Sequence, residues 1–244
     1  MKYRDLALIA SERVYDVQSD PTHKAVKDIV SHYGFDTYKL INTLYSEALV
    51  ADSASLLMIA VRGTDEWEEW FNNFFVGPRH NLYDLVADKS IHVHAGFESR
   101  TYRLLEKLND TFAQESLISK ATTKKRVLLT GHSVGGAVAA LIAFWTTAKY
   151  RLPTTLYGFG TPRVGDETLY NELDRLCGTA VFYEHLMDVV PYFPPHYLNN
   201  PLAELVGGLR NPFDVVGNHQ ISTYREAMIK ETVPGVEQAY SSQT

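Results

Sequence analysis

The spacing of apolar residues changes several times along the chain, and each change predicts a different element. Residues 55–61, SLLMIAV, are almost continuously apolar, which is typical of a strand buried on both faces of a sheet. In residues 97–112, apolar positions such as Tyr102, Leu105 and Leu108 recur at three- and four-residue spacing, which predicts an amphipathic helix. The first part of the chain therefore predicts both strand and helix.

Helices are also expected before the first strand. One is predicted over residues 2–15 and a second over about 21–33. Asp20 can serve as the N-cap of the second helix with Pro21 in its first position, and Gly34 stands where a left-handed C-cap belongs.

Beyond residue 126, predicted strands and helices alternate. The extended segments are 127–130, 154–159 and 179–183, and the helical ones are 133–150 and 166–176. Alternation of this kind predicts an α/β fold with a single, mostly parallel sheet flanked by helices. We interpret residues 1–244 as one domain with a polar tail from about residue 237.

The composition of the chain bears on its binding partners and on the compartment in which it can fold. The chain has 23 Lys and Arg residues against 29 Asp and Glu, a formal net charge of −6, and its longest basic run is residues 124–126. This balance argues against a nucleic-acid partner. The single cysteine, Cys177, allows no internal disulfide, so folding demands no oxidising compartment.

Targeting signals are weak in this sequence. No run approaches 18 apolar residues, so no transmembrane segment is predicted, and the apolar stretch at residues 6–10 is too short for a signal peptide. The expected location is the cytoplasm, or outside the cell after export without a visible Sec signal.

Residues 131–135, GHSVG, match the pattern G-x-S-x-G between a predicted strand and a predicted helix. This context is typical of a nucleophile elbow, in which a tight strand-to-helix turn presents a serine hydroxyl and the helix N-terminus supports developing negative charge. Ser133 is therefore the candidate nucleophile. The alternative is a tight turn with an incidental serine.

A nucleophilic serine needs a base and an acid that orients the base. Three histidines follow Ser133 in the chain: His185, His196 and His219. His219 is favoured because it lies in a loop just before a predicted helix over residues 222–228, whereas His185 ends a predicted strand and His196 follows two prolines.

Four aspartates are candidates for the acid: Asp166, Asp174, Asp188 and Asp214. Asp174 is expected on the solvated face of a helix. Asp188 follows the predicted strand 179–183, and a carboxylate at the C-terminal edge of a parallel sheet can reach a site there.

Several segments together resemble the lipase class 3 family, α/β-hydrolases typified by secreted fungal triacylglycerol lipases. The resemblance rests on these segments, in chain order: VRGT (61–64), VHAGF (93–97), GHSVGGA (131–137), FGTPRVGD (159–166) and DVVP (188–191). It covers about residues 55–224 and implies an α/β-hydrolase fold with no cofactor or metal.

The resemblance also implies roles for single residues. Ser133 would be the nucleophile, Asp188 the orienting acid and His219 the base, with Asp166 as a structural loop residue. The N–H groups of Thr64 and Val134, with the Thr64 hydroxyl as a further donor, would form the oxyanion hole.

Residues 65–74, DEWEEWFNNF, occupy the position of the family's lid. The resemblance makes Trp67, Trp70 and Phe71 lid residues that face substrate. The alternative is a surface helix that packs its aromatic side chains permanently. His92 and His94 alternate like metal ligands, but strand-like spacing without a third ligand favours a structural role.

These observations predict a carboxylic ester hydrolase, in the first place a triacylglycerol lipase that acts through an acyl-enzyme. Its partners would be an acylglycerol or another lipid ester and, transiently, a lipid–water interface. A short-chain carboxylesterase or a phospholipase of the same fold is the main alternative, and a non-catalytic binding module is the alternative from another class.

Overall fold

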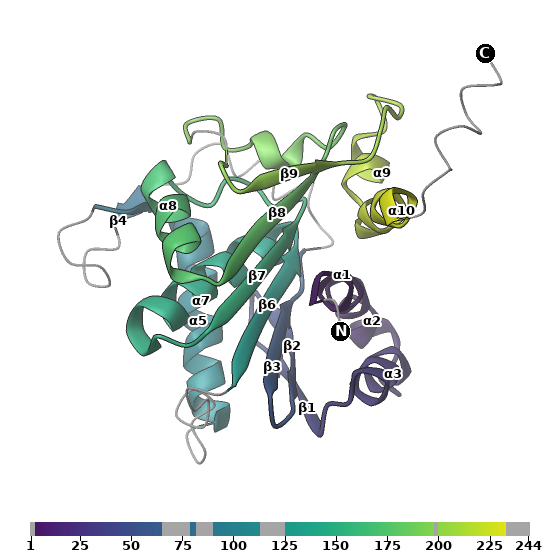
Figure 1. Cartoon of the computed structure of the whole chain (residues 1–244), viewed down its shortest axis with the longest axis vertical. Helices are drawn as coiled ribbons and strands as arrows, with labels where there is room; N and C mark the ends of the chain where they lie inside the picture. The colour runs from purple at the N-terminus through teal and green to yellow at the C-terminus, as the bar shows by residue number, and fades with distance from the viewer. Residues whose placement is uncertain (1–2, 65–78, 82–89, 113–124, 198–199, 233–244) are drawn as a thin grey trace.

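A seven-stranded sheet runs through the centre of the molecule (Figure 1). The computed structural model describes residues 3–64, 79–81, 90–112, 125–197 and 200–232. The strands lie in the order β1-β2-β3-β6-β7-β8-β9, and β4 pairs with β5 separately. Their bounds are β1 Thr37–Asn42, β2 Glu47–Asp52, β3 Leu56–Val61, β4 Arg79–Asn81, β5 His92–His94, β6 Arg126–His132, β7 Thr154–Phe159, β8 Thr179–His185 and β9 Ala203–Val206.

Four neighbouring strand pairs, from β3 to β9, are parallel, and the pairs β1–β2 and β2–β3 are antiparallel. The prediction of a mostly parallel sheet is therefore confirmed. The edge strand β1 and its neighbour β2 are joined to the sheet through short turns, which suffice for antiparallel neighbours but not for parallel ones.

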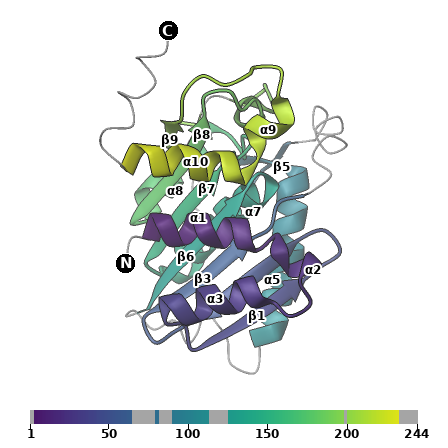
Figure 2. The ribbon, with the colours of Figure 1, turned by 90° about the vertical axis from the view of Figure 1, so that its right-hand side faces the viewer.

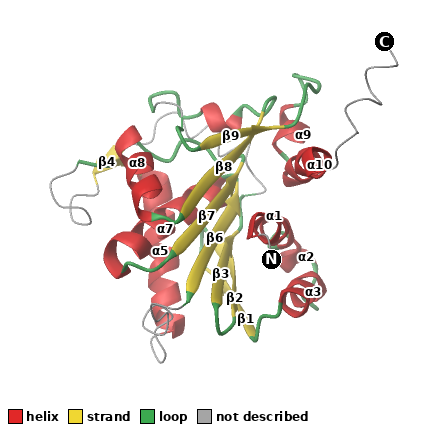
Figure 3. Cartoon of the chain, viewed as in Figure 1, coloured by secondary structure: helices red, strands yellow, loops and turns green. Residues whose placement is uncertain are grey.

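Helices cover both faces of the sheet (Figures 1 to 3). Helices α5, α7 and α8 pack on one face, and α1, α3 and α10 on the other, so each face has its own apolar core. The helices are α1 Tyr3–Arg13, α2 Asp16–Ser19, α3 Lys24–Tyr33, α5 Ala95–Phe112, α7 Val134–Tyr150, α8 Glu167–Leu176, α9 Val215–His219 and α10 Ile221–Thr232, with a 3₁₀ turn η1 at Val190–Tyr192.

Most predicted elements agree with the structure within a few residues, but the N-terminal helices differ. The helix predicted over 2–15 ends at Arg13 and is followed by the short α2, and the helix predicted from residue 21 begins at Lys24. The Asp20 carboxylate accepts the backbone N–H groups of Thr22 and Lys24, so it closes a turn before the helix instead of capping it directly. Gly34 has φ 72°, as predicted for a left-handed C-cap.

The predicted amphipathic helix corresponds to α5, with one of its apolar positions at the rim of the core. Leu105 and Leu108 are buried as expected, together with Leu104. Tyr102, however, is 48% exposed, and its ring lies edge-on to Trp145 of α7. Tyrosine can cover the rim of a core while its hydroxyl stays in water, which apolar spacing alone does not distinguish from burial.

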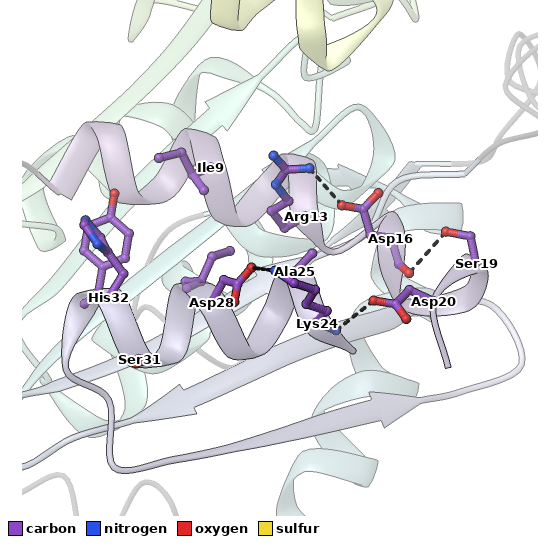
Figure 4. A pocket seen from close by; sticks show the side chains of 12 residues that line it. Ile9, Arg13, Asp16, Ser19, Asp20, Lys24, Ala25, Asp28, Ser31 and His32 are labelled. Carbon is purple, nitrogen blue, oxygen red and sulfur yellow. Dashed lines mark hydrogen bonds and ion pairs between the residues drawn. The ribbon is translucent and has the colours of Figure 1, made fainter. Parts of the chain in front are cut away.

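A surface groove of about 770 Å³ lies between α1, α2 and α3 (Figure 4). Two ion pairs lie along it: Arg13 is 3.1 Å from Asp16, and Lys24 is 2.6 Å from Asp28. None of the lining residues belongs to the predicted triad. Among the helices of the described ranges, none is both long and apolar enough to cross a bilayer.

Candidate active site

The turn between β6 and α7 has the geometry expected of a nucleophile elbow. Ser133 has φ 56° and ψ −131°, a strained conformation for a residue with a side chain. A Cβ on Gly131 would lie 2.6 Å from the Gly136 nitrogen, and one on Gly135 would overlap the Val61 carbonyl oxygen. The strand, the turn and the helix can approach this closely because both positions are glycine.

Ser133, His219 and Asp188 form one hydrogen-bonded line. The Ser133 Oγ lies 2.9 Å from His219 Nε2, and His219 Nδ1 lies 2.7 Å from Asp188 Oδ2. All three residues are buried. Because an ionised carboxylate only accepts hydrogen bonds, Nδ1 carries the imidazole proton and Nε2 is left to accept from the serine hydroxyl. The arrangement can deprotonate the serine.

Asp188 lies just beyond the end of β8 and is held by several donors. The Tyr224 hydroxyl donates to Oδ2 at 2.5 Å, and the Val190 N–H donates to Oδ1 at 2.9 Å. Burial, with the nearby Asp188 charge, raises the pKa of Tyr224 well above its ordinary value, so the hydroxyl keeps its proton. These donors stabilise the ionised carboxylate.

Gly160 makes room for this arrangement. It has φ 55°, and a Cβ there would lie 2.9 Å from Asp188 Oδ2 and 3.1 Å from His219 Cε1. A side chain at this position would therefore displace either the acid or the imidazole.

His219 is the last residue of α9, a five-residue helix, whereas the sequence predicted a loop. Asp214 caps this helix by accepting the Gly217 N–H at 2.9 Å, so this candidate acid has a local structural role. The carbonyl oxygen of His219 lies 2.6 Å from Nε2 of His132, and Nδ1 of His132 lies 2.9 Å from the Tyr15 hydroxyl.

The other candidates lie elsewhere or serve other contacts. His185 is buried at the end of β8 and accepts the Met187 N–H at its Nδ1, and His196 is exposed beside Tyr197. Asp174 is exposed on α8, as predicted.

Asp166 caps α8 by accepting the Leu169 N–H, and it also lies 3.0 Å from His92 Nδ1. His94 is buried, and its Nδ1 accepts the Gly96 N–H. In the described part of the chain, no group of three or more His, Cys, Asp or Glu side chains is placed to hold a metal ion.

Of the two predicted oxyanion-hole residues, Val134 directly follows the serine and Thr64 follows a glycine that lies beside it. Val134 opens α7, where the first backbone N–H groups lack intrahelical acceptors. Thr64 follows Gly63, and a Cβ on Gly63 would lie 3.3 Å from the Ser133 Cβ. The end of β3 therefore passes beside the serine. The predicted lid, residues 65–74 with Trp67, Trp70 and Phe71, lies outside the described residues.

Sequence reasoning missed Tyr15, His132 and Tyr224. His132 stands at a variable position of G-x-S-x-G, and Tyr15 is 117 residues from its partner. The sequence indicates Tyr224 only weakly, through its position five residues after His219, which places it near the candidate base.

The profile of the lipase class 3 family matches residues 58–198. The chain belongs to this family. It is 34% identical over 143 residues to "Secreted mono- and diacylglycerol lipase 1" of Fusarium solani, and this alignment covers 57% of this chain and 39% of that protein. It is 26% identical over 201 residues to "Phospholipase A1-II 6" of Oryza sativa subsp. japonica, with coverage of 69% and 49%. The match thus spans less than half of each relative.

Solved structures of lipases share the fold. The mono- and diacylglycerol lipase of Aspergillus oryzae superposes with a TM-score of 0.66 at 17% identity, over 86% of this chain and 82% of that one. A lipase from Rhizopus microsporus var. chinensis gives a TM-score of 0.63 at 23% identity, over 80% and 69%. The predicted α/β-hydrolase fold and the predicted family are both confirmed.

Proposed function

We propose that this protein is a serine ester hydrolase that cleaves acylglycerols through an acyl-enzyme. The observation that supports it most is the hydrogen-bonded line from Asp188 through His219 to Ser133, with the serine on a strained turn. Membership of the lipase class 3 family and relatives named as lipases support the acylglycerol substrate.

In the proposed reaction, His219 Nε2 takes the proton of Ser133 while Oγ attacks the ester carbonyl carbon. The tetrahedral intermediate collapses as the imidazolium gives this proton to the departing alcohol. Water, activated by the same imidazole, then attacks the acyl-enzyme and releases the fatty acid. Asp188 keeps the imidazole in the productive tautomer and stabilises its cation.

The oxyanion formed in each step needs fixed donors. The Val134 N–H, at the start of α7, and the Thr64 N–H, in the segment beside the serine, are the proposed pair. The N-terminus of α7, a 17-residue helix, also lies at this point, and the positive potential of the helix dipole there stabilises the negative charge of the oxyanion.

Removal of the nucleophile tests the proposal. The variant Ser133→Ala should fold like the parent. Its rate of ester hydrolysis should be lower by about four orders of magnitude or more, and a fluorophosphonate probe should no longer label it. The matched control is Ser19→Ala, which changes an exposed serine in α2 and should keep both properties. Labelling of the Ser133→Ala variant at the parent's rate would refute the assignment, and a parent with neither labelling nor hydrolysis would support a binding module.

We further propose that residues 65–74 act as a lid at a lipid–water interface. The support is that Ser133 is only 1% exposed, so an ester must gain access to its hydroxyl. Trp70→Ala should reduce hydrolysis of emulsified long-chain triglyceride at least about threefold more than hydrolysis of dissolved short-chain esters. Equal losses, or a lowered melting temperature, would favour a permanently packed helix.

Phospholipid is the second candidate substrate, because one relative that covers 69% of the chain is named a phospholipase A1. A panel of triglyceride, diglyceride, phosphatidylcholine and nitrophenyl esters of increasing length would separate lipase, phospholipase and esterase.

Hydrolytic activity should survive treatment with EDTA, because no step of the proposed reaction uses a metal ion. Loss on chelation, restored by a divalent ion, would revive the metal hypothesis for His92 and His94.

The proposed location is outside the cell, because the Fusarium relative is named as secreted, whereas the cytoplasmic alternative has no such support. Separation of the native host's cells from the medium, with fluorophosphonate labelling of both fractions, would test the location.

The assignment of residues 1–244 to one domain stays a prediction.

A further inference from the structure

The strand residue before the nucleophile, His132, joins the N-terminal segment to the main chain of the catalytic histidine. Its Nε2 lies 2.6 Å from the His219 carbonyl oxygen, and its Nδ1 lies 2.9 Å from the Tyr15 hydroxyl. The rings of His132 and His219 are 4.7 Å apart and tilted by 34°. The hydrogen bond from His132 reaches His219 at its backbone, whereas Ser133 and Asp188 hydrogen-bond to its imidazole.

The direction of these hydrogen bonds follows from the partners. A carbonyl oxygen only accepts, so His132 Nε2 donates and carries the ring proton. Nδ1 of a neutral imidazole then accepts from the Tyr15 hydroxyl. Burial, together with the nearby His219, lowers the pKa of His132 well below its ordinary value, which keeps the ring in this neutral form.

An anchor from outside the segment matters for His219 because the helix that carries it is short. It ends a five-residue helix, and a helix this short is marginal without tertiary contacts. Its side chain is fixed at Nδ1 by Asp188. A second anchor at the carbonyl restrains the backbone from which the side chain projects, and with it the distance from Nε2 to the Ser133 hydroxyl.

Tyr15 is itself held against the segment that leads to Thr64. The Arg62 guanidinium lies 5.3 Å from the centre of the Tyr15 ring, and a Cβ on Gly63 would overlap the Tyr15 hydroxyl. Tyr15 therefore touches both the proposed oxyanion segment and the His132 ring, and it comes from outside the family match at residues 58–198.

We propose that Tyr15 and His132 are positioning residues, which hold the His219 main chain so that its imidazole stays aligned with Ser133. This inference rests on the proposed function. It assigns a catalytic consequence to the N-terminal helices, which otherwise cover one face of the sheet (Figure 2).

The variant Tyr15→Phe removes one hydroxyl and keeps the ring. It should lower kcat about 3- to 10-fold with KM unchanged, since the imidazole loses alignment while the substrate contacts stay. Rates are divided by the fraction of sites that a fluorophosphonate titrates to completion, so misfolded protein does not count. The matched control is Tyr170→Phe, a buried tyrosine whose hydroxyl accepts the Val164 N–H; it should lose stability and keep kcat per titrated site.

His132 variants complete the test. His132→Leu should lower kcat more than Tyr15→Phe, His132→Gln should restore part of the loss because its amide can donate to the same carbonyl, and Tyr15→Phe should add little to His132→Leu. If Tyr15→Phe stays within twofold of the Tyr170→Phe control, or if its loss lies only in KM or in the titratable fraction, the inference is wrong. An inactive parent protein would instead refute the proposed function.

Discussion

The serine and the histidine of the proposed triad are held in two different ways. Ser133 sits on a turn whose shape depends on neighbours within a few residues, Gly131 and Gly135, between a strand and a long helix. His219 ends a five-residue helix, and its contacts reach Asp188, Ser133 and His132, which are 31, 86 and 87 residues away.

This difference predicts how substitutions at the elbow and in the segment around His219 affect the protein. The elbow is encoded by consecutive residues, and its two glycines leave no room for added side chains, because a Cβ there would meet backbone atoms of the turn itself or of residues 61–63. The histidine segment is specified by distant side chains, so its position depends on several hydrogen bonds, each of which contributes modestly. Changes in the first region should break the fold or the reaction outright, and changes in the second should lower the rate in steps.

The largest expected effect is the loss of the imidazole. His219→Ala should reduce kcat by about 10⁴- to 10⁶-fold, and the double variant with Ser133→Ala should be no worse than either single variant, because a triad acts as a unit. Residual turnover of purified protein measures this. His196→Ala, at an exposed position, is the control. A larger loss in His196→Ala or His185→Ala would mean that the histidine is misassigned.

The next effect tests how closely the elbow packs against the end of β3. Gly135→Ala places a Cβ against the Val61 carbonyl oxygen and 2.9 Å from the Gly63 nitrogen, so it should destabilise the protein by about 3 kcal/mol or prevent folding. Denaturant unfolding measures the change. At Gly178 the nearest atom to an added Cβ would be 3.7 Å away, so Gly178→Ala should be nearly neutral. Equal stability of the two variants would contradict a close approach of α7 to β3.

A pH effect on stability is expected from the strand that leads to Asp188. Burial, opposed by Arg163, raises the pKa of Glu184 from 4.5 to about 7. Between these pH values the folded state keeps the proton that the unfolded state has lost. The free energy of unfolding should therefore decrease as pH rises from about 4.5 to 7, by on the order of 2 kcal/mol.

Chemical denaturation of Glu184→Gln at pH 4.5 and pH 7 measures this contribution. The amide does not ionise, so the variant should lose part of the pH dependence and gain stability relative to the parent at pH 7. An unchanged difference between the two pH values would assign the effect to other groups.

The smallest effect concerns a single donor to the acid. Tyr224→Phe removes the hydroxyl that lies 2.5 Å from Asp188 Oδ2 and should lower kcat about 3- to 10-fold, since Asp188 keeps its bond from the Val190 N–H. Steady-state kinetics on a dissolved ester would show it. A loss as large as that of His219→Ala would mean that the histidine segment collapses when one contact is removed.

The elements with strong local signals were predicted well. Residues 154–159 agree with β7 in both bounds, and residues 133–150 differ from α7 by one residue, because apolar composition, glycine and chain direction decide these segments locally. The predicted start of α3 was wrong and Tyr102 lies at the rim of the core, since a side-chain capped turn and the depth of burial depend on contacts that spacing does not contain.

The candidate site divides in the same way. Ser133 could be predicted from five consecutive residues and their context, and Asp188 and His219 could be proposed from chain order and family resemblance. Tyr15, His132 and Tyr224 could not, because nothing near them in the sequence distinguishes them from ordinary buried aromatic and histidine residues.

Local sequence was thus sufficient for the mostly parallel sheet, the elbow and the proposal of Ser133 as nucleophile, because steric limits on the backbone and apolar periodicity act over a few residues. Only the tertiary structure brought Tyr15 to His132 and His132 to the His219 carbonyl, and only it placed Tyr224 on Asp188. Those contacts depend on how the helices on one face of the sheet pack over its central strands, and that packing is decided by the whole apolar core.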